Sequence, residues 1–225
     1  KKNNKYNVFI IYKMTIKTLV LSGGGPNGIL TVGFLHALIK NEFINLEHID
    51  KYYGTSIGAF IAVLCCINYD FSHIADFIIK RPWEKVANIE SDDILEIISG
   101  GGFMDKFNSL LKKEMFLKLL EAQDCTETTT FLELYQKTNK EVYIYTIDID
   151  DFELIEISYK SHPDLTIIQG IMMSAALPPF IRPMEYENHY YIDGGILENY
   201  PLNSCLVNAE TPDEVLGINF TNNER

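Results

Sequence analysis

The pentapeptide Gly54-Thr55-Ser56-Ile57-Gly58 holds the side chain best suited to nucleophilic chemistry in this chain. It follows an apolar run of strand length and precedes an apolar run of helical length, which is the setting of a nucleophile elbow. Gly54 and Gly58 allow the tight turn that holds a serine clear of a sheet. The helix start also adds partial positive charge where an oxyanion would develop. The pattern predicts Ser56 as a nucleophile, and the alternative is a plain turn in which Ser56 caps the helix.

A glycine-rich segment, Gly23-Gly24-Gly25-Pro26-Asn27-Gly28, follows the first predicted strand and opens a helix. Glycines let the backbone turn sharply and present N–H groups to an anion at a helix N-terminus. Gly23, Gly25 and Gly28 also match the dinucleotide-binding pattern G-x-G-x-x-G. Pro26 is excluded as a donor because it has no N–H. By itself the segment leaves open an oxyanion hole, a nucleotide loop and a tight turn.

A nucleophilic serine needs a base, and the chain offers two kinds. His162 and His189 follow Ser56, as the histidine does in α/β-hydrolases, but no histidine follows Asp193. Asp193 ends a predicted strand and precedes Gly194 and Gly195, so a tight turn can present it with little steric cover. It is therefore the better candidate base, although taken alone it is better explained as a turn residue.

The charge of the chain excludes some partners. Nineteen Lys and Arg stand against 31 Asp and Glu, a formal net charge of -12. Nucleic acid is not an expected partner because no basic stripe is present. Membrane contact would need a local patch. Lysines and apolar residues alternate between Lys106 and Lys118, which is one candidate, although such a helix more often packs on a core with its charged face in water.

Neither a metal site nor a disulfide framework is predicted. Asp148, Asp150 and Asp151 are better explained by turn chemistry between two strands. The four cysteines are expected to be buried hydrophobes in a reducing compartment. The longest apolar stretch, from Ile57 to Asn68, is shorter than the roughly 20 residues that span a bilayer. We expect a cytoplasmic protein; peripheral membrane contact and the oligomeric state stay open.

The elements that must position these residues alternate between strand and helix patterns, which predicts an α/β sheet. The predicted strands are Lys17-Ser22, His48-Tyr53, Glu141-Ile149, Phe152-Tyr159, Tyr190-Asp193 and Glu214-Phe220, the third and fourth forming a hairpin. The predicted helices are Ile29-Lys40, Ile57-Ile67, Asp164-Ser174 and most of Phe71-Thr138, which is broken at Gly100-Gly102. No repeat or linker divides the chain, so we expect one domain over residues 17-225 after an N-terminal extension over 1-16.

The glycine loop, the serine elbow and the Asp-Gly-Gly turn, in this order, resemble the patatin-like phospholipase family. The similarity runs from about Lys17 to Phe220. One departure is Asn27, where many members carry Arg or Lys. Four further segments are similar to the family: Gly101-Gly102-Phe103, Thr130-Phe131-Leu132-Glu133-Leu134-Tyr135, Ser174-Ala175-Ala176-Leu177-Pro178-Pro179-Phe180 and Asn199-Tyr200-Pro201-Leu202.

The resemblance implies a three-layer α/β/α domain with a mostly parallel central sheet. It also implies a lipid acyl hydrolase of the phospholipase A or lysophospholipase type. Ser56 would attack an ester carbonyl of a glycerolipid or phospholipid substrate while Asp193 takes its proton. No metal or organic cofactor is implied. The oxyanion would lie against the glycine loop, with Gly24 and Gly25 as favoured donors beside Gly23, Asn27 and Gly28.

Three rival functions remain open from the sequence. A Rossmann-type dinucleotide-binding protein would explain the glycine loop but leave the elbow and the Asp-Gly-Gly turn as coincidences. A serine esterase acting on small non-lipid esters, or a protein hydrolase, would use the same residues on another substrate. An inactive lipid-binding relative would keep the fold, but the intact Ser56 and Asp193 argue against it.

Overall fold

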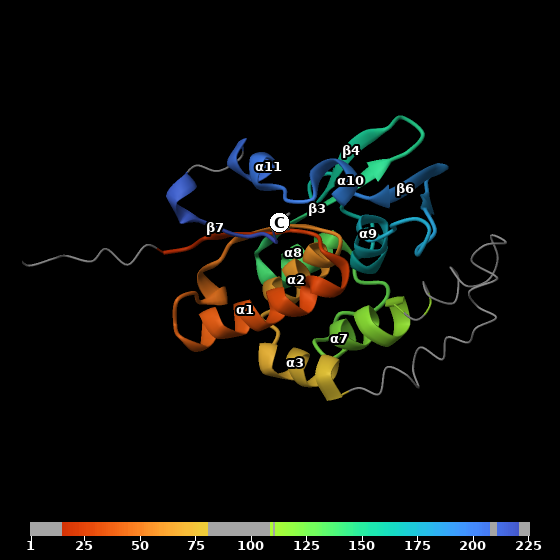
Figure 1. The fold of residues 1–225 in the computed structure, drawn as a ribbon. Coiled ribbons are helices and arrows are strands. Elements are labelled where there is room, and N and C mark those ends of the chain that lie inside the picture. Colours follow the sequence, from red (N-terminus) through yellow and green to blue (C-terminus); the bar gives the residue numbers. More distant parts are fainter. Residues whose placement is uncertain (1–14, 81–108, 110, 208–210, 221–225) are drawn as a thin grey trace, which may run out of the picture.

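The computed structural model describes residues 15–80, 109, 111–207 and 211–220 (Figure 1). Its centre is a seven-stranded sheet in the order β5-β6-β3-β2-β1-β7, in which β4 also pairs with β3. Strands β7, β1, β2 and β3 are parallel, whereas β4, β5 and β6 run antiparallel to their neighbours. The strands are β1 (Thr18–Leu21), β2 (Lys51–Thr55), β3 (Glu141–Asp148), β4 (Glu153–Ile157), β5 (Met184–Tyr186), β6 (His189–Asp193) and β7 (Val215–Ile218).

Helices cover both faces of this sheet. Helices α1, α2 and α3 lie on one side and α11 lies on the other (Figure 1). The mostly parallel α/β architecture predicted from the sequence is confirmed. The helices are α1 (Gly28–Lys40), α2 (Ile57–Cys66), α3 (Phe71–Lys80), a π-helical segment (Leu111–Leu117) that continues into α7 (Lys118–Glu121), α8 (Phe131–Thr138), α9 (Ile167–Ser174), α10 (Gly195–Glu198) and α11 (Leu202–Val207).

The alternation of side chains along β1 divides the core between the two faces. Leu19 and Leu21 belong to the larger apolar cluster, which also contains the buried side chains of α2. Val20 points the other way, into a smaller cluster with Tyr53 and Cys205. This is the expected period of two along a strand that is covered on both faces. The four cysteines are all buried and free, as predicted.

The second strand begins and ends later than predicted. His48 lies in a 3-10 turn, where the Asn45 side chain accepts a hydrogen bond from the N–H of Glu47. β2 begins at Lys51 and continues through Thr55, because Thr55 pairs with Tyr145 of β3. Long-range pairing therefore extends the strand across Gly54 up to the nucleophile elbow.

In the C-terminal half, one predicted helix begins later than expected and one strand was missed. The helix predicted from Asp164 begins at Ile167, because Thr166 and Gln169 form a capping box at that point. The short strand β5 was not predicted; its residues become a strand by pairing with β6. The extension up to residue 14 and the Gly100-Gly102 break lie outside the described residues.

The basic amphipathic segment is described only from Leu111 onward, apart from residue 109. Lys112 pairs with Glu127 and Lys118 pairs with Glu114, each at 2.6 Å, while Phe116 and Leu117 are buried. This part packs on the core, and two of its lysines are ion-paired. In the described ranges no helix combines the length and apolar character that crossing a bilayer requires.

Candidate active site

The turn from β2 into α2 places Ser56 in an unusual backbone conformation. Its φ is 55° and its ψ is -125°, a combination that a residue with a side chain keeps only where its surroundings hold it. The flanking glycines are required by close contact. A Cβ on Gly54 would lie 2.5 Å from the carbonyl oxygen of Gly58, and one on Gly58 would lie 2.6 Å from that of Leu21.

Asp193 ends β6 directly beside this turn. The Ser56 hydroxyl donates a hydrogen bond to Asp193 Oδ2 at 2.6 Å, and the N–H of Gly195 donates to Oδ1 at 2.7 Å. Both side chains are largely inaccessible, with Ser56 9% and Asp193 5% exposed. Gly194 is needed here because a Cβ would collide with the carbonyl oxygen of Tyr145. The structure therefore brings together the two residues that the sequence singled out.

The surroundings of Asp193 change its acidity. Burial raises the pKa of the Asp193 carboxyl above its ordinary value, and the hydrogen bonds from Ser56 and Gly195 oppose part of that change. Burial dominates because it penalises the ionised carboxylate. A higher pKa makes the carboxylate a better proton acceptor than an exposed aspartate.

The histidines lie elsewhere. His189 Nδ1 is 2.7 Å from Asp148 Oδ2, and His162 Nδ1 is 3.0 Å from the hydroxyl oxygen of Ser161. In the described ranges no histidine forms a hydrogen bond or an ion pair with Ser56 or Asp193. The described geometry thus contains a serine–aspartate pair and no serine–histidine pair.

The glycine loop lies against the nucleophile. A Cβ on Gly23 would lie 3.2 Å from Ser56 Cβ and would collide with the Asn199 side chain, while one on Gly28 would collide with the Ile57 side chain. These two glycines therefore allow the loop and α1 to approach the start of α2 closely.

The loop N–H groups differ in whether they are free to bind an anion. The N–H of Gly23 donates to Asn199 O at 2.9 Å, that of Asn27 donates to Gly24 O at 3.0 Å, and that of Gly28 bonds within the loop. Within the described part of the chain, the N–H groups of Gly24 and Gly25 have no such partner. Among the residues that the structure describes, these two of the five predicted loop residues are the ones whose backbone N–H is free.

The segment after the Asp-Gly-Gly turn connects all three motifs. The Thr55 hydroxyl donates to Glu198 O at 2.9 Å, and Asn199 O accepts the N–H of Gly23. Residues 198–199 thus fasten the elbow and the glycine loop to the segment that carries Asp193. The sequence marked Asn199 only by family likeness, because no local pattern shows which carbonyl a distant N–H will bind.

The aspartates between β3 and β4 behave as predicted for a turn. Asp148 Oδ1 accepts the N–H of Asp150 at 2.9 Å, and Asp150 Oδ2 accepts that of Tyr190 at 2.9 Å. Asp148, Asp151 and His189 have potential ligand atoms within 4.8 Å of one another, the one such group in the described ranges. Asp148 and Asp150 are engaged in these hydrogen bonds, and Asp148 also lies against His189.

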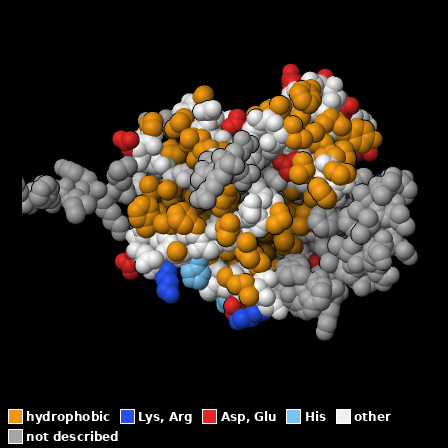
Figure 2. Space-filling model, viewed as in Figure 1, with side chains coloured by type: hydrophobic (Ala, Val, Ile, Leu, Met, Phe, Trp, Pro, Cys, Tyr) orange, Lys and Arg blue, Asp and Glu red, His pale blue; other side chains and the backbone are white. Residues whose placement is uncertain are grey.

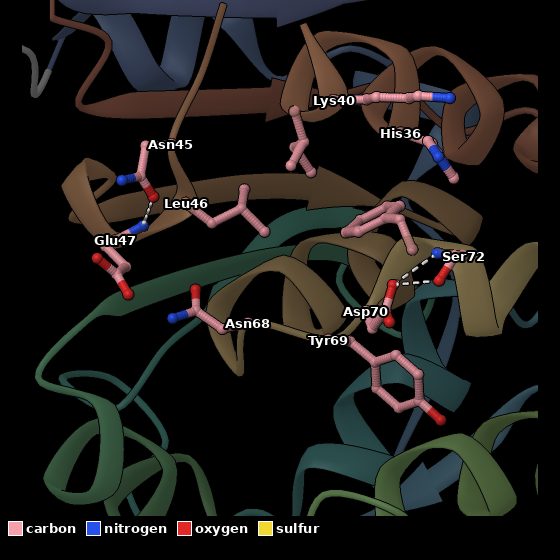
Figure 3. A pocket seen from close by; sticks show the side chains of 11 residues that line it. His36, Lys40, Asn45, Leu46, Glu47, Asn68, Tyr69, Asp70 and Ser72 are labelled. Atoms are coloured by element: carbon pink, nitrogen blue, oxygen red, sulfur yellow. Dashed lines mark hydrogen bonds between the residues drawn. The ribbon is translucent and has the colours of Figure 1, made fainter. Parts of the chain in front are cut away.

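A surface cavity of about 420 Å³ lies away from this site (Figure 3). It is formed by the end of α1, the Leu46–His48 turn and the α2–α3 connection, with His36, Lys40, Asn45, Glu47, Asp70 and Ser72 among its lining residues. None of the predicted site residues lines it.

Large apolar side chains are exposed on the segments that flank the dyad and the glycine loop. Hydrophobic side chains gather on the face seen in Figure 2, and most of the charged ones visible there lie towards its edge. Leu30 is 57% exposed on the first turn of α1, and Phe180 is 57% exposed a few residues after α9. The others on these segments are Ile29, Phe34, Leu177, Ile196 and Leu197.

Solved structures share this fold. VipD from Legionella pneumophila matches with a TM-score of 0.60 and 20% identity, covering 90% of this chain and 49% of that one. The type III effector protein ExoU of Pseudomonas aeruginosa matches with a TM-score of 0.51 and 20% identity, covering 73% of this chain and 41% of that one. This chain therefore spans about half the length of the solved structures it matches.

Sequence relatives and a family model agree. The chain is 30% identical over 210 residues to "Probable lipid hydrolase 463L" of Invertebrate iridescent virus 6, covering 92% of this chain and 68% of the relative. It is 26% identical over 227 residues to "Uncharacterized protein R571" of Acanthamoeba polyphaga mimivirus, covering 94% and 68%. The model for patatin-like phospholipase matches residues 19–206. The chain belongs to the patatin-like phospholipase family.

Proposed function

We propose that this protein is a serine-dependent lipid acyl hydrolase, of the phospholipase A or lysophospholipase type, that uses Ser56 and Asp193 as a catalytic dyad. The observation that supports it most is the hydrogen bond of 2.6 Å from Ser56 Oγ to Asp193 Oδ2. The serine of this hydrogen bond lies at a nucleophile elbow. The chain also belongs to the patatin-like phospholipase family. A carboxylate so placed can accept the hydroxyl proton as the oxygen attacks.

The proposed reaction has two halves. Ser56 Oγ attacks the ester carbonyl, its proton passes to Asp193 Oδ2, and the protonated Asp193 then donates to the departing alcohol oxygen. In the second half Asp193 takes a proton from the water that attacks the acyl-serine ester. As the bond between the acyl carbon and Ser56 Oγ breaks, Asp193 returns that proton to Oγ, and the fatty acid is released. Each half leaves Asp193 ionised, so the dyad is restored.

The negative charge on the tetrahedral intermediate needs donors fixed in advance. The N–H groups of Gly24 and Gly25 are the donors we propose, because they have no other partner among the described residues and the loop lies against Ser56. Gly23, Asn27 and Gly28 would shape this oxyanion hole without donating to it, since their N–H groups are already engaged.

A glycerolipid substrate is supported by two observations. Exposed apolar side chains flank the dyad segments, and a relative of this chain is named a probable lipid hydrolase. The dinucleotide-binding alternative lacks such support, because Gly23 and Gly28 of the G-x-G-x-x-G pattern serve close packing against Ser56 and Ile57.

The test is fatty-acid release from phosphatidylcholine vesicles by the wild-type protein and by Ser56→Ala, with p-nitrophenyl acetate as a small-ester comparison. We expect release by the wild type and its loss in the variant. Hydrolysis of the small ester alone would favour the small-ester alternative. Equal release by both proteins would exclude Ser56 as the nucleophile.

A further inference from the structure

The C-terminal end of α9 and the residues just after it hold the backbones of the nucleophile and the base at the same time. The N–H of Ser56 donates to the hydroxyl oxygen of Ser174 at 2.8 Å. The N–H of Asp193 donates to the carbonyl oxygen of Ala176 at 2.9 Å. Both Ser174 and Ala176 are 0% exposed. Two residues that are two positions apart therefore fix the backbone of Ser56, which follows β2, and that of Asp193, which ends β6.

The direction of the Ser174 hydroxyl is set by a second hydrogen bond. It donates to the carbonyl oxygen of Tyr145 at 2.6 Å, which leaves its oxygen free to accept from Ser56. Tyr145 pairs with Thr55 in the sheet, so the hydroxyl is anchored to the strand beside the elbow. A side chain without an acceptor oxygen would leave the N–H of Ser56 without this partner in a buried position.

Ser56 needs this contact because its backbone conformation is strained. On its C-terminal side, the carbonyl oxygen of Ser56 accepts the N–H of Ala59 at 3.0 Å, so α2 holds that end. On its N-terminal side, the Ser174 hydroxyl is the group that binds the N–H. Removing it frees one end of the turn that aims Oγ at Asp193.

We propose that Ser174 is a positioning residue that sets the distance and direction between Ser56 Oγ and Asp193 through its hydrogen bond to the Ser56 N–H. This inference rests on the proposed role of Ser56 as the nucleophile. Ser174 is fully buried and does not reach a substrate. Its loss should therefore lower kcat and leave KM close to the wild-type value.

The test compares Ser174→Ala with Ser158→Ala. Ser158 is a matched control because its hydroxyl is also buried, at 1% exposure, and hydrogen-bonded, but only to Ser161 and Lys160. We measure the rate at which a fluorophosphonate probe labels Ser56, kcat and KM on phosphatidylcholine vesicles, and the melting temperature. We expect Ser174→Ala to lower the labelling rate and kcat by about 10²-fold, the scale of a misplaced reacting group. Ser158→Ala should keep both rates per folded molecule.

Equal rates per folded molecule in the two variants would overturn the inference. If Ser174→Ala does not fold, Ser174→Cys replaces it, since a thiol is close in size but a weak donor and acceptor. A slow Cys variant supports the positioning role and a wild-type rate overturns it. A wild-type protein that labels at Ser56 but releases no fatty acid would contradict the lipid-hydrolase proposal while the labelling rates still test Ser174. No labelling of wild-type Ser56 would overturn both.

Discussion

The Ser56 hydroxyl and the Asp193 carboxylate, 137 residues apart in the sequence, are joined by a hydrogen bond of 2.6 Å. They meet because β3 pairs both with β2, which ends directly before Ser56, and with β6, which ends at Asp193. Thr55, which precedes the nucleophile, is the register partner of Tyr145, and Asp193 is the partner of Thr146. Tyr145 and Thr146 are adjacent along β3. Because these two partners are adjacent residues of β3, the sheet itself brings the side chains of Ser56 and Asp193 together, before any substrate binds.

Because Ser56 and Asp193 take part in the same proton transfer, removing either one should abolish the same step of catalysis. Ser56→Ala and Asp193→Asn should each lower kcat by about 10³-fold or more, and the double variant should be little slower than either single one. Vesicle hydrolysis by all four proteins measures this. If the loss of kcat in the double variant equals the product of the two single losses, this would argue against a shared proton-transfer step.

The pH profile should report the base. Asp193 must be ionised to accept a proton, so kcat/KM should fall as the pH falls through its pKa. Burial raises that pKa, so the midpoint of the acid limb should lie above the unperturbed aspartate value of about 3.9. Melting temperatures at each pH separate this loss from unfolding. A midpoint at or below that value, in folded protein, would contradict the prediction.

Asp193→Asn should also change stability, with a defined sign. The folded-state pKa is raised, so the free energy of unfolding is greatest when Asp193 is protonated and decreases as the pH rises from the unfolded-state pKa through the folded-state pKa. Asparagine resembles the neutral form and can still accept from Gly195. The variant should therefore melt at a higher temperature than the wild type at neutral pH, with the gain vanishing below about pH 3.9. A lower melting temperature at neutral pH would contradict this.

Histidine variants should separate the dyad from a triad. His189→Ala and His162→Ala should each retain most of the wild-type kcat, because His189 contacts Asp148 and His162 contacts Ser161. His189→Ala should instead weaken the edge where β3 pairs with β6, a small loss of melting temperature. A fall of orders of magnitude in either variant, in protein that is folded by circular dichroism, would indicate a triad.

The elbow glycines should be intolerant of a methyl group. Gly54→Ala should lower the free energy of unfolding by at least about 2 kcal/mol, because its Cβ would press on the backbone of Gly58 and Ala59. Gly33→Ala is the matched control: it lies in α1 with nothing within 4 Å of its Cβ, and should stabilise the helix by up to about 1 kcal/mol. Denaturant unfolding compares the two. Equal changes in the free energy of unfolding would mean that the contact between β2 and α2 can accommodate the added methyl group.

The sequence by itself determined the parts of this protein whose cause is local. The apolar run before Gly23 and the helical run after Ser56 predict β1 and α2, because a period of two or of 3.6 needs only near neighbours. The tight spacing of the elbow is local too, since the glycines at 54 and 58 are needed within the same turn. The likeness of three ordered segments then indicated the family, and with it the pairing of Ser56 and Asp193.

The tertiary structure decided everything that depends on contacts between distant segments. β2 extends to Thr55 because β3 pairs with it, β5 exists because β6 pairs with it, and His189 binds Asp148 instead of Asp193. The choice of Ser174 as the partner of the Ser56 N–H is of the same kind, since 118 residues separate them. The sequence around a buried serine contains no periodic pattern that predicts which backbone group its hydroxyl will bind. That partner is fixed only when the packed sheet and helices place one unpaired N–H beside one available oxygen.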